Sequence, residues 1–310
     1  MTHLSRIVLT GCALAALALL FSLAPAYSQA TPLTGQQILQ KVDARGGIGG
    51  IGSTISLSTF DVVDKTGTEQ QKNFIFFGKN SADPKVPNRV LIYFLEPPKT
   101  TCGTIFLSID HKIVGKQADL FLFLPALGQT KQLVTTNERK GSFAGSNLQF
   151  DQIGRSELHS DFNAKLIGEA TVQGVTINGK KQDRQAYVLQ LTVNKENDPN
   201  ESFPQRKLWV DQQEFIMLKS EDTNTIGKLQ NKTSLDDLVS FRGRLEPNLI
   251  KVVNVLDNSS TTVTISDRQD ADKLLGGLPD SLFAPDSLPQ FDPTQFNDKL
   301  TTKVPDPTCP

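Results

Sequence analysis

This chain has few cysteines, few histidines and almost no net charge, and each of these features excludes a class of site. Only three cysteines and three histidines occur, none of them paired at the spacing of a zinc site, and no H-E-x-x-H is present. Asp236-Asp237 is an isolated acidic pair and not a cation loop. The 32 basic residues nearly balance the 33 acidic ones, so no field attracts nucleic acid. We expect no metal, no cofactor and no polyanionic partner.

Apolar runs of membrane-spanning length are absent after residue 30, and the one long run precedes it. Arg6 gives a weakly positive start, Ile7 to Ala26 is almost unbroken apolar sequence, and Ser28-Gln29-Ala30 has the small-x-small form that signal peptidase cuts. The sequence therefore predicts a signal peptide over residues 1–30 and export of a soluble chain. Two alternatives stay open, which are lipid attachment at Cys12 and retention of the segment as an anchor.

The mature chain would keep two cysteines, Cys102 and Cys309, in an oxidising compartment. Whether they pair stays open, because Cys309 belongs to a Pro-rich end. No linker interrupts the sequence before that end, so we expect one domain over residues 31–288 and a disordered tail over residues 289–310.

The expected elements are one helix and then strands. Thr34 and Gln37 have the form of a capping box, and Ile38, Leu39 and Val42 follow on one helical face. About a dozen short strands come next, which predicts an antiparallel sheet curled into a barrel or half-barrel. Asn178-Gly179 is typical of a hairpin turn. The predicted strands cover residues 54–63, 73–78, 89–95, 104–109, 119–124, 164–173, 186–194, 206–211, 215–221, 229–241, 249–256 and 261–267.

Three early strands are apolar throughout instead of alternating. These are Phe74 to Phe77, Val90 to Leu95 and Leu120 to Leu124. Continuous apolar runs require that both faces of the sheet are out of water, either under a cover or against an apolar cavity. A densely packed aromatic core explains these runs as well as a cavity does.

Two motifs that suggest chemistry lack the context that the chemistry needs. Gly47 to Gly52 matches G-x-G-x-x-G, but here a helix precedes and a strand follows, the reverse of a dinucleotide site. Gly141 to Gly145 places Ser142 second, whereas a nucleophile elbow has serine third. His111 and His159 therefore have no recognisable nucleophile to serve, and we expect no enzyme.

One segment resembles a known family. Leu122 to Gly128, then Lys131, then Gly141 to Asn147 closely resemble the "YLPAL…R…SF-x-G-[ST]-D" segment of outer-membrane lipoprotein-sorting proteins of the LolA-like superfamily. The motif residues here are Leu124, Pro125, Ala126, Leu127, Ser142, Phe143 and Gly145. The flanks are similar too, over Thr34–Arg45, Phe94–Thr104, Arg206–Asp211 and Leu278–Leu288. Phe123 and Asn147 stand where the family usually has Tyr and Asp, and residues 129–133 are less basic.

The resemblance implies an unclosed antiparallel β-barrel, mainly β with few helices, whose helices cover the concave face and enclose an apolar cavity. It implies a monomeric periplasmic carrier, soluble or peripheral to the membrane, for lipoprotein acyl chains or a phospholipid-like ligand moving toward the outer membrane. The alternative is a non-enzymatic docking subunit of an inner-membrane (RND-type) transporter, with a lipid hydrolase third. Alternation along the strands gives the candidate lining residues Phe74, Phe76, Leu91, Tyr93, Leu122 and Leu124.

Overall fold

The computed structural model describes residues 32–47, 50–95 and 101–306. The predicted signal peptide, Cys12, Cys309 and part of the glycine run lie outside the described residues. The chain from Thr34 onward forms one compact unit. No helix among the described residues has both the length and the apolar composition needed to cross a membrane.

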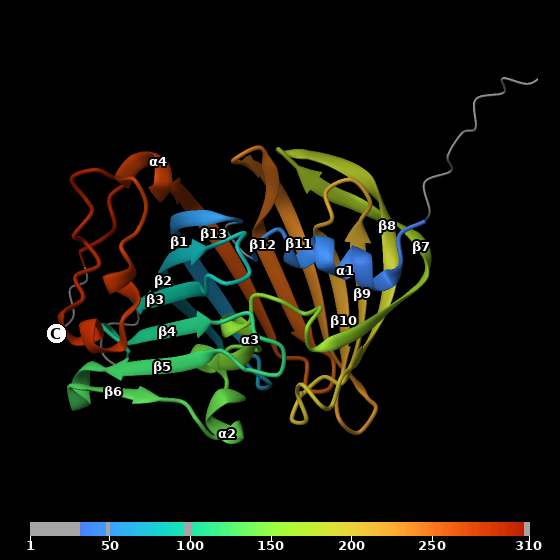
Figure 1. The fold of residues 1–310 in the computed structure, drawn as a ribbon, viewed down its shortest axis with the longest axis horizontal. Helices are drawn as coiled ribbons and strands as arrows, with labels where there is room; N and C mark the ends of the chain where they lie inside the picture. The colour runs from blue at the N-terminus through green and yellow to red at the C-terminus, as the bar shows by residue number, and fades with distance from the viewer. Residues whose placement is uncertain (1–31, 48–49, 96–100, 307–310) are drawn as a thin grey trace, which may run out of the picture. The chain divides into compact units, whose positions relative to one another are not determined.

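A single large sheet, curved but not closed as a regular barrel, dominates this unit (Figure 1). Its strands lie in the order β10-β9-β8-β7-β11-β12-β13-β1-β2-β3-β4-β5-β6, and β10 also pairs with β11. Every pairing is antiparallel except one bridge between β7 and β11. The first six strands are β1 (Gly52–Val63), β2 (Glu69–Asn80), β3 (Asn88–Phe94), β4 (Ile105–Asp110), β5 (Asp119–Leu124) and β6 (Gln129–Gln132). The others are β7 (Phe162–Ile177), β8 (Lys180–Val193), β9 (Gln205–Asp211), β10 (Met217–Thr223), β11 (Leu229–Phe241), β12 (Arg244–Asn254) and β13 (Ser260–Asp270). The predicted fold class is confirmed.

The helices are few and short. They are α1 (Gly35–Asp43), α2 (Thr136–Arg139), α3 (Phe150–Gly154) and α4 (Ala271–Leu275), with 3-10 turns η1 (Pro125–Leu127), η2 (Phe143–Gly145), η3 (Asp280–Phe283) and η4 (Pro285–Gln290). α1 has the predicted capping box, since the Thr34 hydroxyl accepts from the Gln37 amide and the Gln37 side chain accepts from the Thr34 amide. The predicted hairpin turn is also present, with Asn178 and Gly179 both at positive φ.

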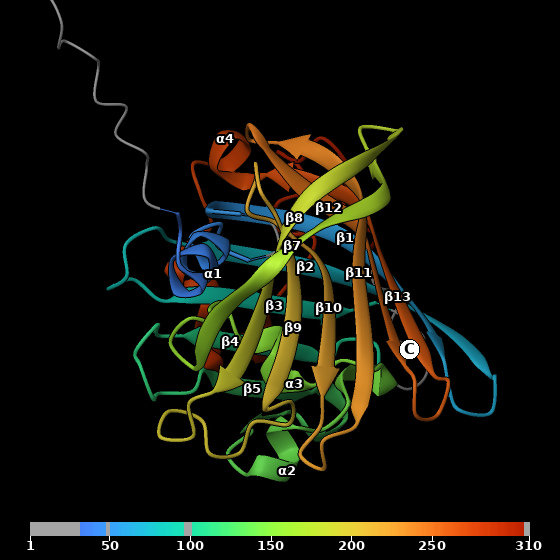
Figure 2. The same cartoon turned by 90° about the vertical axis from the view of Figure 1, so that its right-hand side faces the viewer.

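The apolar strands have both faces buried, as their sequence requires. On one face of β2–β5, Ile75, Phe77, Leu91 and Leu107 form a core with α4 and the C-terminal segment. On the other face, Phe74, Phe94 and Phe106 pack with Phe143 of η2 and Phe150 of α3. Figure 2 shows the strands of this half crossing behind those of β7 to β11. The second face is the concave face of the sheet. It shares residues such as Phe60 and Ile250 with the cavity described below.

The prediction of a disordered tail is wrong for the described part of residues 289–310. Leu300 and Val304 are buried in the core on the convex face, and Phe291 and Phe296 pack against it. The Phe77 ring lies 5.3 Å from that of Phe291, edge to face. The prolines prevent a regular helix or strand but do not prevent packing, since four apolar side chains face the sheet.

Candidate ligand-binding cavity

The concave face of the sheet borders a cavity of about 390 Å³. This lies within the range of roughly 300–1,000 Å³ that small-molecule sites occupy. The cavity is roofed by Val42, Asp43 and Gly46 at the end of α1 and by Leu148 and residues 152–158 around α3. Its floor runs across β4, β3, β2, β1, β13, β12, β11, β10 and β9.

Side-chain size explains why this part of the concave face is hollow. Alternate positions of β1 place Thr54, Ser56 and Ser58 on the cavity floor, whereas Ile55 and Leu57 belong to the core on the convex face. Across the neighbouring strands, Thr54 pairs with Gly78 and Ser58 with Ile265. Small side chains on the floor leave space that phenylalanine fills elsewhere.

The walls of the cavity are mainly apolar. Phe60 and Phe76 bound it on the side of the phenylalanine cluster, where Phe60, Phe74, Phe76, Phe94, Phe106, Phe143 and Phe150 pack together. The apolar floor consists of Leu208, Met217, Leu235, Ile250, Val252, Val263 and Ile265. Water makes few favourable contacts with such a surface, so the cavity suits an apolar ligand.

The six predicted lining residues lie at different places relative to the cavity. Phe76 lines the cavity, and Phe74 and Leu122 lie on the same face but pack into the phenylalanine cluster. Leu91 and Tyr93 are wrong, because they belong to the core on the convex face. β3 pairs with β2 so that Ile92 lies opposite Phe76, and opposite residues share a face. Leu124 is not among the lining residues, and it is half-buried at the end of β5.

The family-motif segment forms a plug beside the cavity. Leu124 ends β5, and Pro125, Ala126 and Leu127 form the exposed turn η1. Ser142 precedes η2, and its hydroxyl donates to the Ser146 carbonyl. Phe143 is fully buried, and its ring lies 5.3–5.9 Å from those of Phe60, Phe74, Phe94, Phe106 and Phe150. Gly145 has φ +77°, which favours glycine.

Asn147 fixes this plug to β13. Its backbone amide donates to the Thr261 hydroxyl at 2.9 Å, its side-chain amide donates to the Ser259 hydroxyl at 2.6 Å, and the Thr261 hydroxyl donates to Asn147 Oδ1 at 2.9 Å. The side-chain amide of Asn147 both donates and accepts, as these two side-chain contacts require.

Polar contacts of α1 join it to the other part of the roof and to β7. The Asp43 carboxylate accepts from the Leu158 and His159 amides at 2.9 and 2.7 Å and lies 2.9 Å from His159 Nδ1. That contact with Asp43 raises the pKa of His159, against the effect of partial burial. Gln36 donates to the His159 carbonyl and accepts from the Ala164 amide of β7. We call α1 and residues 155–159 the lid.

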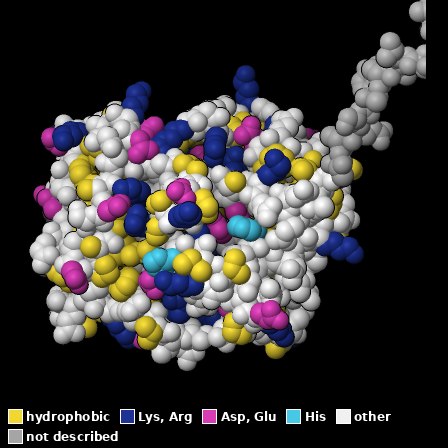
Figure 3. Space-filling model, in the orientation of Figure 1, with side chains coloured by type: hydrophobic (Ala, Val, Ile, Leu, Met, Phe, Trp, Pro, Cys, Tyr) yellow, Lys and Arg dark blue, Asp and Glu magenta, His cyan; other side chains and the backbone are white. Residues whose placement is uncertain are grey.

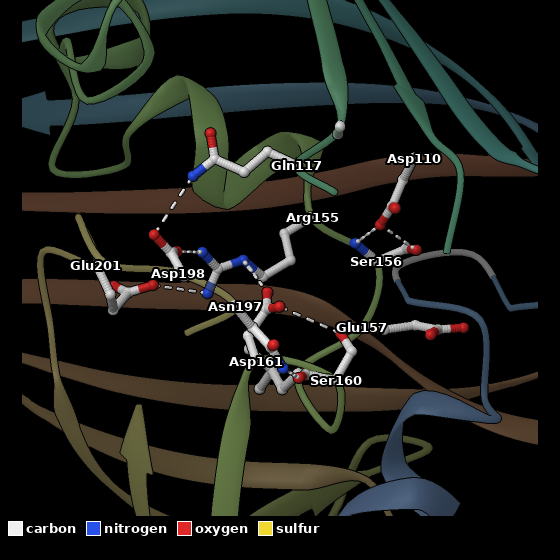
Figure 4. A network of polar contacts seen from close by, with 12 residues as sticks. Asp110, Gln117, Arg155, Ser156, Glu157, Ser160, Asp161, Asn197, Asp198 and Glu201 are labelled. Carbon is white, nitrogen blue, oxygen red and sulfur yellow. Dashed lines mark hydrogen bonds and ion pairs between the residues drawn. The ribbon is translucent and has the colours of Figure 1, made fainter. Parts of the chain in front are cut away.

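A buried ionic network lies at one end of the lid (Figure 4). Arg155 donates to Asp198 at 3.0 Å and lies 2.7 Å from Glu201, and Asp161 lies 3.7 Å away. Glu201 also accepts from Arg206 at 3.2 Å. Burial opposes ionisation of Glu201, but Arg206 and Arg155 outweigh it and lower the pKa of Glu201 to about 2. The network anchors the chain after α3 to β9.

Among the described residues, both mature histidines and the possible metal ligands can be placed. The His111 ring contacts Asp119 at 2.6 Å, and the His159 ring contacts Asp43 and Glu157, so both rings pair with carboxylates. No group of three or more His, Cys, Asp or Glu side chains in the described ranges is placed to hold a metal ion. Cys102 is disulfide-bonded, and the two other cysteines of the chain lie outside those ranges. The face that carries α1 and α3 mixes apolar, basic and acidic side chains (Figure 3).

Three solved structures share this fold. A putative outer membrane lipoprotein-sorting protein domain from Vibrio parahaemolyticus has a TM-score of 0.66 and 20% identity, over 82% of this chain and 98% of that one. A DUF1329 family protein from Desulfovibrio piger has a TM-score of 0.70 and 18% identity, over 82% and 97%. A LolA superfamily protein from Nitrosomonas europaea has a TM-score of 0.60 and 20% identity, over 82% and 99%.

These likenesses define the fold as LolA-like, which confirms the resemblance seen in the sequence. A family model described only as an uncharacterized protein matches residues 87–290, more than half of the chain, and the chain belongs to that family. No curated protein matches it.

Proposed function

We propose that this protein is a non-enzymatic periplasmic carrier that binds the acyl chains of a lipoprotein or lipid in the cavity and moves them toward the outer membrane. The observation that carries the proposal is the cavity itself, about 390 Å³ with a mainly apolar lining under a helical lid. The fold shared with the lipoprotein-sorting domain and the LolA superfamily protein supports it.

The energetics fit passive carriage. Each methylene that leaves water for the cavity contributes about 0.8 kcal/mol, so an acyl chain binds through shape and apolar area without reactive groups. The lid is joined to the rest of the unit by the polar contacts of Gln36 with Ala164 and of Arg155 with Asp198, and by the buried Ile38 and Leu39 of α1. The polar contacts among these exchange with water at little net cost, which suits a lid that opens to release the ligand. We expect the carrier to act as a monomer.

The test is native mass spectrometry of residues 31–310 purified from a bacterial periplasm, followed by organic extraction and lipid analysis. Ser56→Phe places a large ring on the cavity floor. Thr262→Phe is the matched control, because Thr262 pairs with the exposed Asp61 and Lys251 on the opposite face. We expect a stoichiometric lipid on the parent chain and on Thr262→Phe, and its loss from Ser56→Phe.

Two outcomes contradict the proposal. A parent chain that carries no lipid and takes up none from added vesicles is not a carrier, and a docking subunit of an inner-membrane transporter then becomes the better account. Equal lipid on the parent chain and on Ser56→Phe, with both folded by circular dichroism, places the ligand outside the cavity.

A further inference from the structure

Three polar side chains lie next to one another on β9, β10 and β11, on the concave side of the sheet. Asp222 pairs across the strands with Arg206 on one side and with Asn231 on the other. Arg206 and Asp222 both line the cavity, together with Ser220. We call Arg206, Ser220, Asp222 and Asn231 the polar end of the cavity.

The polar end has hydrogen-bonding atoms without partners. Asp222 and Asn231 are each only 4% exposed. Among the described residues, Asp222 Oδ1, Asn231 Oδ1 and Arg206 Nε have no hydrogen-bond partner. Buried polar atoms are nearly always paired, because leaving them unpaired costs free energy. Arg206 and Asp222 line the cavity and Asn231 is paired with Asp222, so the unpaired Nε of Arg206 and Oδ1 of Asp222 indicate that a ligand group completes them.

The charges around the polar end oppose an anionic ligand group. Arg206 already donates to Glu201, and Arg155 is surrounded by Asp161, Asp198 and Glu201. With Asp222, this cluster contains two arginines and four carboxyl groups. Burial raises the pKa of Asp222 and repulsion from Glu201 adds to it, and together they outweigh the attraction to Arg206 and a hydrogen bond with Ser220.

The other arginines of the cavity wall have partners of their own. Arg89 donates to Asp280 at 3.3 Å, and Arg268 donates to the Pro247 carbonyl at 2.8 Å. The site thus favours a group that donates hydrogen bonds over one that carries negative charge.

We infer that Asp222 binds the hydrogen-bond-donating polar group, an amine or a hydroxyl, of an amphiphile whose apolar chain fills the cavity. The inference rests on the proposed carrier function and adds the chemical class of the ligand. A carboxylate of the same chain length is disfavoured, because it would meet Asp222 Oδ1 without a proton to donate and within an acidic cluster.

The experiment compares three probes with the same twelve-carbon chain, which are dodecylamine, 1-dodecanol and dodecanoate. Their dissociation constants are measured at pH 7 by displacement of the fluorescent apolar probe N-phenyl-1-naphthylamine. The variant is Asp222→Asn, which keeps the shape and removes the charge. Glu221→Gln is the matched control, because Glu221 is the adjacent residue, points to the other face and lies 3.7 Å from Lys232.

We expect the parent chain and Glu221→Gln to bind dodecylamine about tenfold or more tightly than dodecanoate, as one hydrogen bond to a charged group provides, with 1-dodecanol between them. In Asp222→Asn, the preference for the amine should fall to about twofold or less while the protein stays folded by circular dichroism. Equal affinity for all three probes, or a preference that survives Asp222→Asn, overturns the inference but leaves the carrier intact. Failure of all three probes to displace the dye contradicts the carrier itself.

Discussion

Two parts of the concave face share one sheet and one curvature but differ in what covers them. Across β2 to β5, Phe74 and Phe106 pack against Phe143 of the plug, with each ring centroid 5.6 Å from that of Phe143. On β1, Ser56 and Ser58 occupy equivalent inward positions, and a cavity lies above them. The difference teaches that side-chain size at alternate strand positions, and not the fold, decides whether this sheet is filled or hollow.

The filled part should respond most strongly to loss of volume. Phe143→Ala removes a fully buried ring that contacts five others. We expect the free energy of unfolding in urea to fall by about 3–5 kcal/mol. Leu127→Ala, at a side chain that is 64% exposed, should change it by less than about 0.5 kcal/mol. A loss below about 1 kcal/mol for Phe143→Ala would mean that the plug does not hold the filled part together.

The hollow part should depend on its ionic network. Glu201→Gln removes the carboxylate that Arg155 and Arg206 share, and we expect a loss of roughly 1.5–3 kcal/mol at pH 7. The folded pKa of about 2 lies below the ordinary 4.5, so the stabilisation is present above pH 4.5 and is lost as the pH falls toward 2. Urea unfolding at pH 7 and pH 3 measures this, with the exposed Glu196→Gln as control. An equal loss at both pH values would contradict the assignment.

Asp222→Asn should change the stability at pH 7 in the opposite direction, by raising it. Burial raises the folded pKa of Asp222 above the ordinary 3.8, so the ionised side chain costs stability once the pH exceeds the unfolded value. We expect the variant to melt at a higher temperature than the parent chain at pH 7 and at nearly the same temperature near pH 3.5. Scanning calorimetry at both pH values checks this, and a lower melting temperature at pH 7 would show that the carboxylate is satisfied in the folded protein.

The lid contact should give the smallest effect. Asp43 raises the pKa of His159, so the pair stabilises the fold fully below the ordinary value of 6.5 and loses this contribution as the pH rises through the folded pKa. Asp43→Asn should return the His159 titration, followed by NMR of its ring protons, toward the ordinary value. An unchanged titration would mean that α1 and the chain after α3 are not joined through this pair.

Much of the fold could be predicted because its strands obey simple patterns. The Leu229–Phe241 strand has the predicted bounds, and Thr34 and Gln37 form the expected cap. β6 was not predicted, because Gln129–Gln132 contains no apolar residue. This segment forms a strand because its backbone pairs with Phe121 to Leu124 of β5, and its own sequence does not indicate that pairing.

The candidate site was harder to predict, because a face is assigned only when the strand register is known. Leu91 and Tyr93 were placed on the concave face, but the loop between β2 and β3 sets a register in which Ile92 opposes Phe76. The hollow itself could have been predicted from the sequence, because the small residues Thr54, Ser56 and Ser58 stand at alternate positions of one strand. The polar end could not have been predicted in this way, because its residues come from three strands and the sequence does not show how those strands pair.

The most direct test of the central claim is to find where a bound chain touches the protein. A dodecylamine derivative with a diazirine at the end of its chain is bound to residues 31–310, activated by light and mapped by peptide mass spectrometry. The account predicts labels on Ile250, Val252, Val263 and Ile265 of the cavity floor. Labels on Leu91, Tyr93 and Leu107 of the opposite face would contradict it.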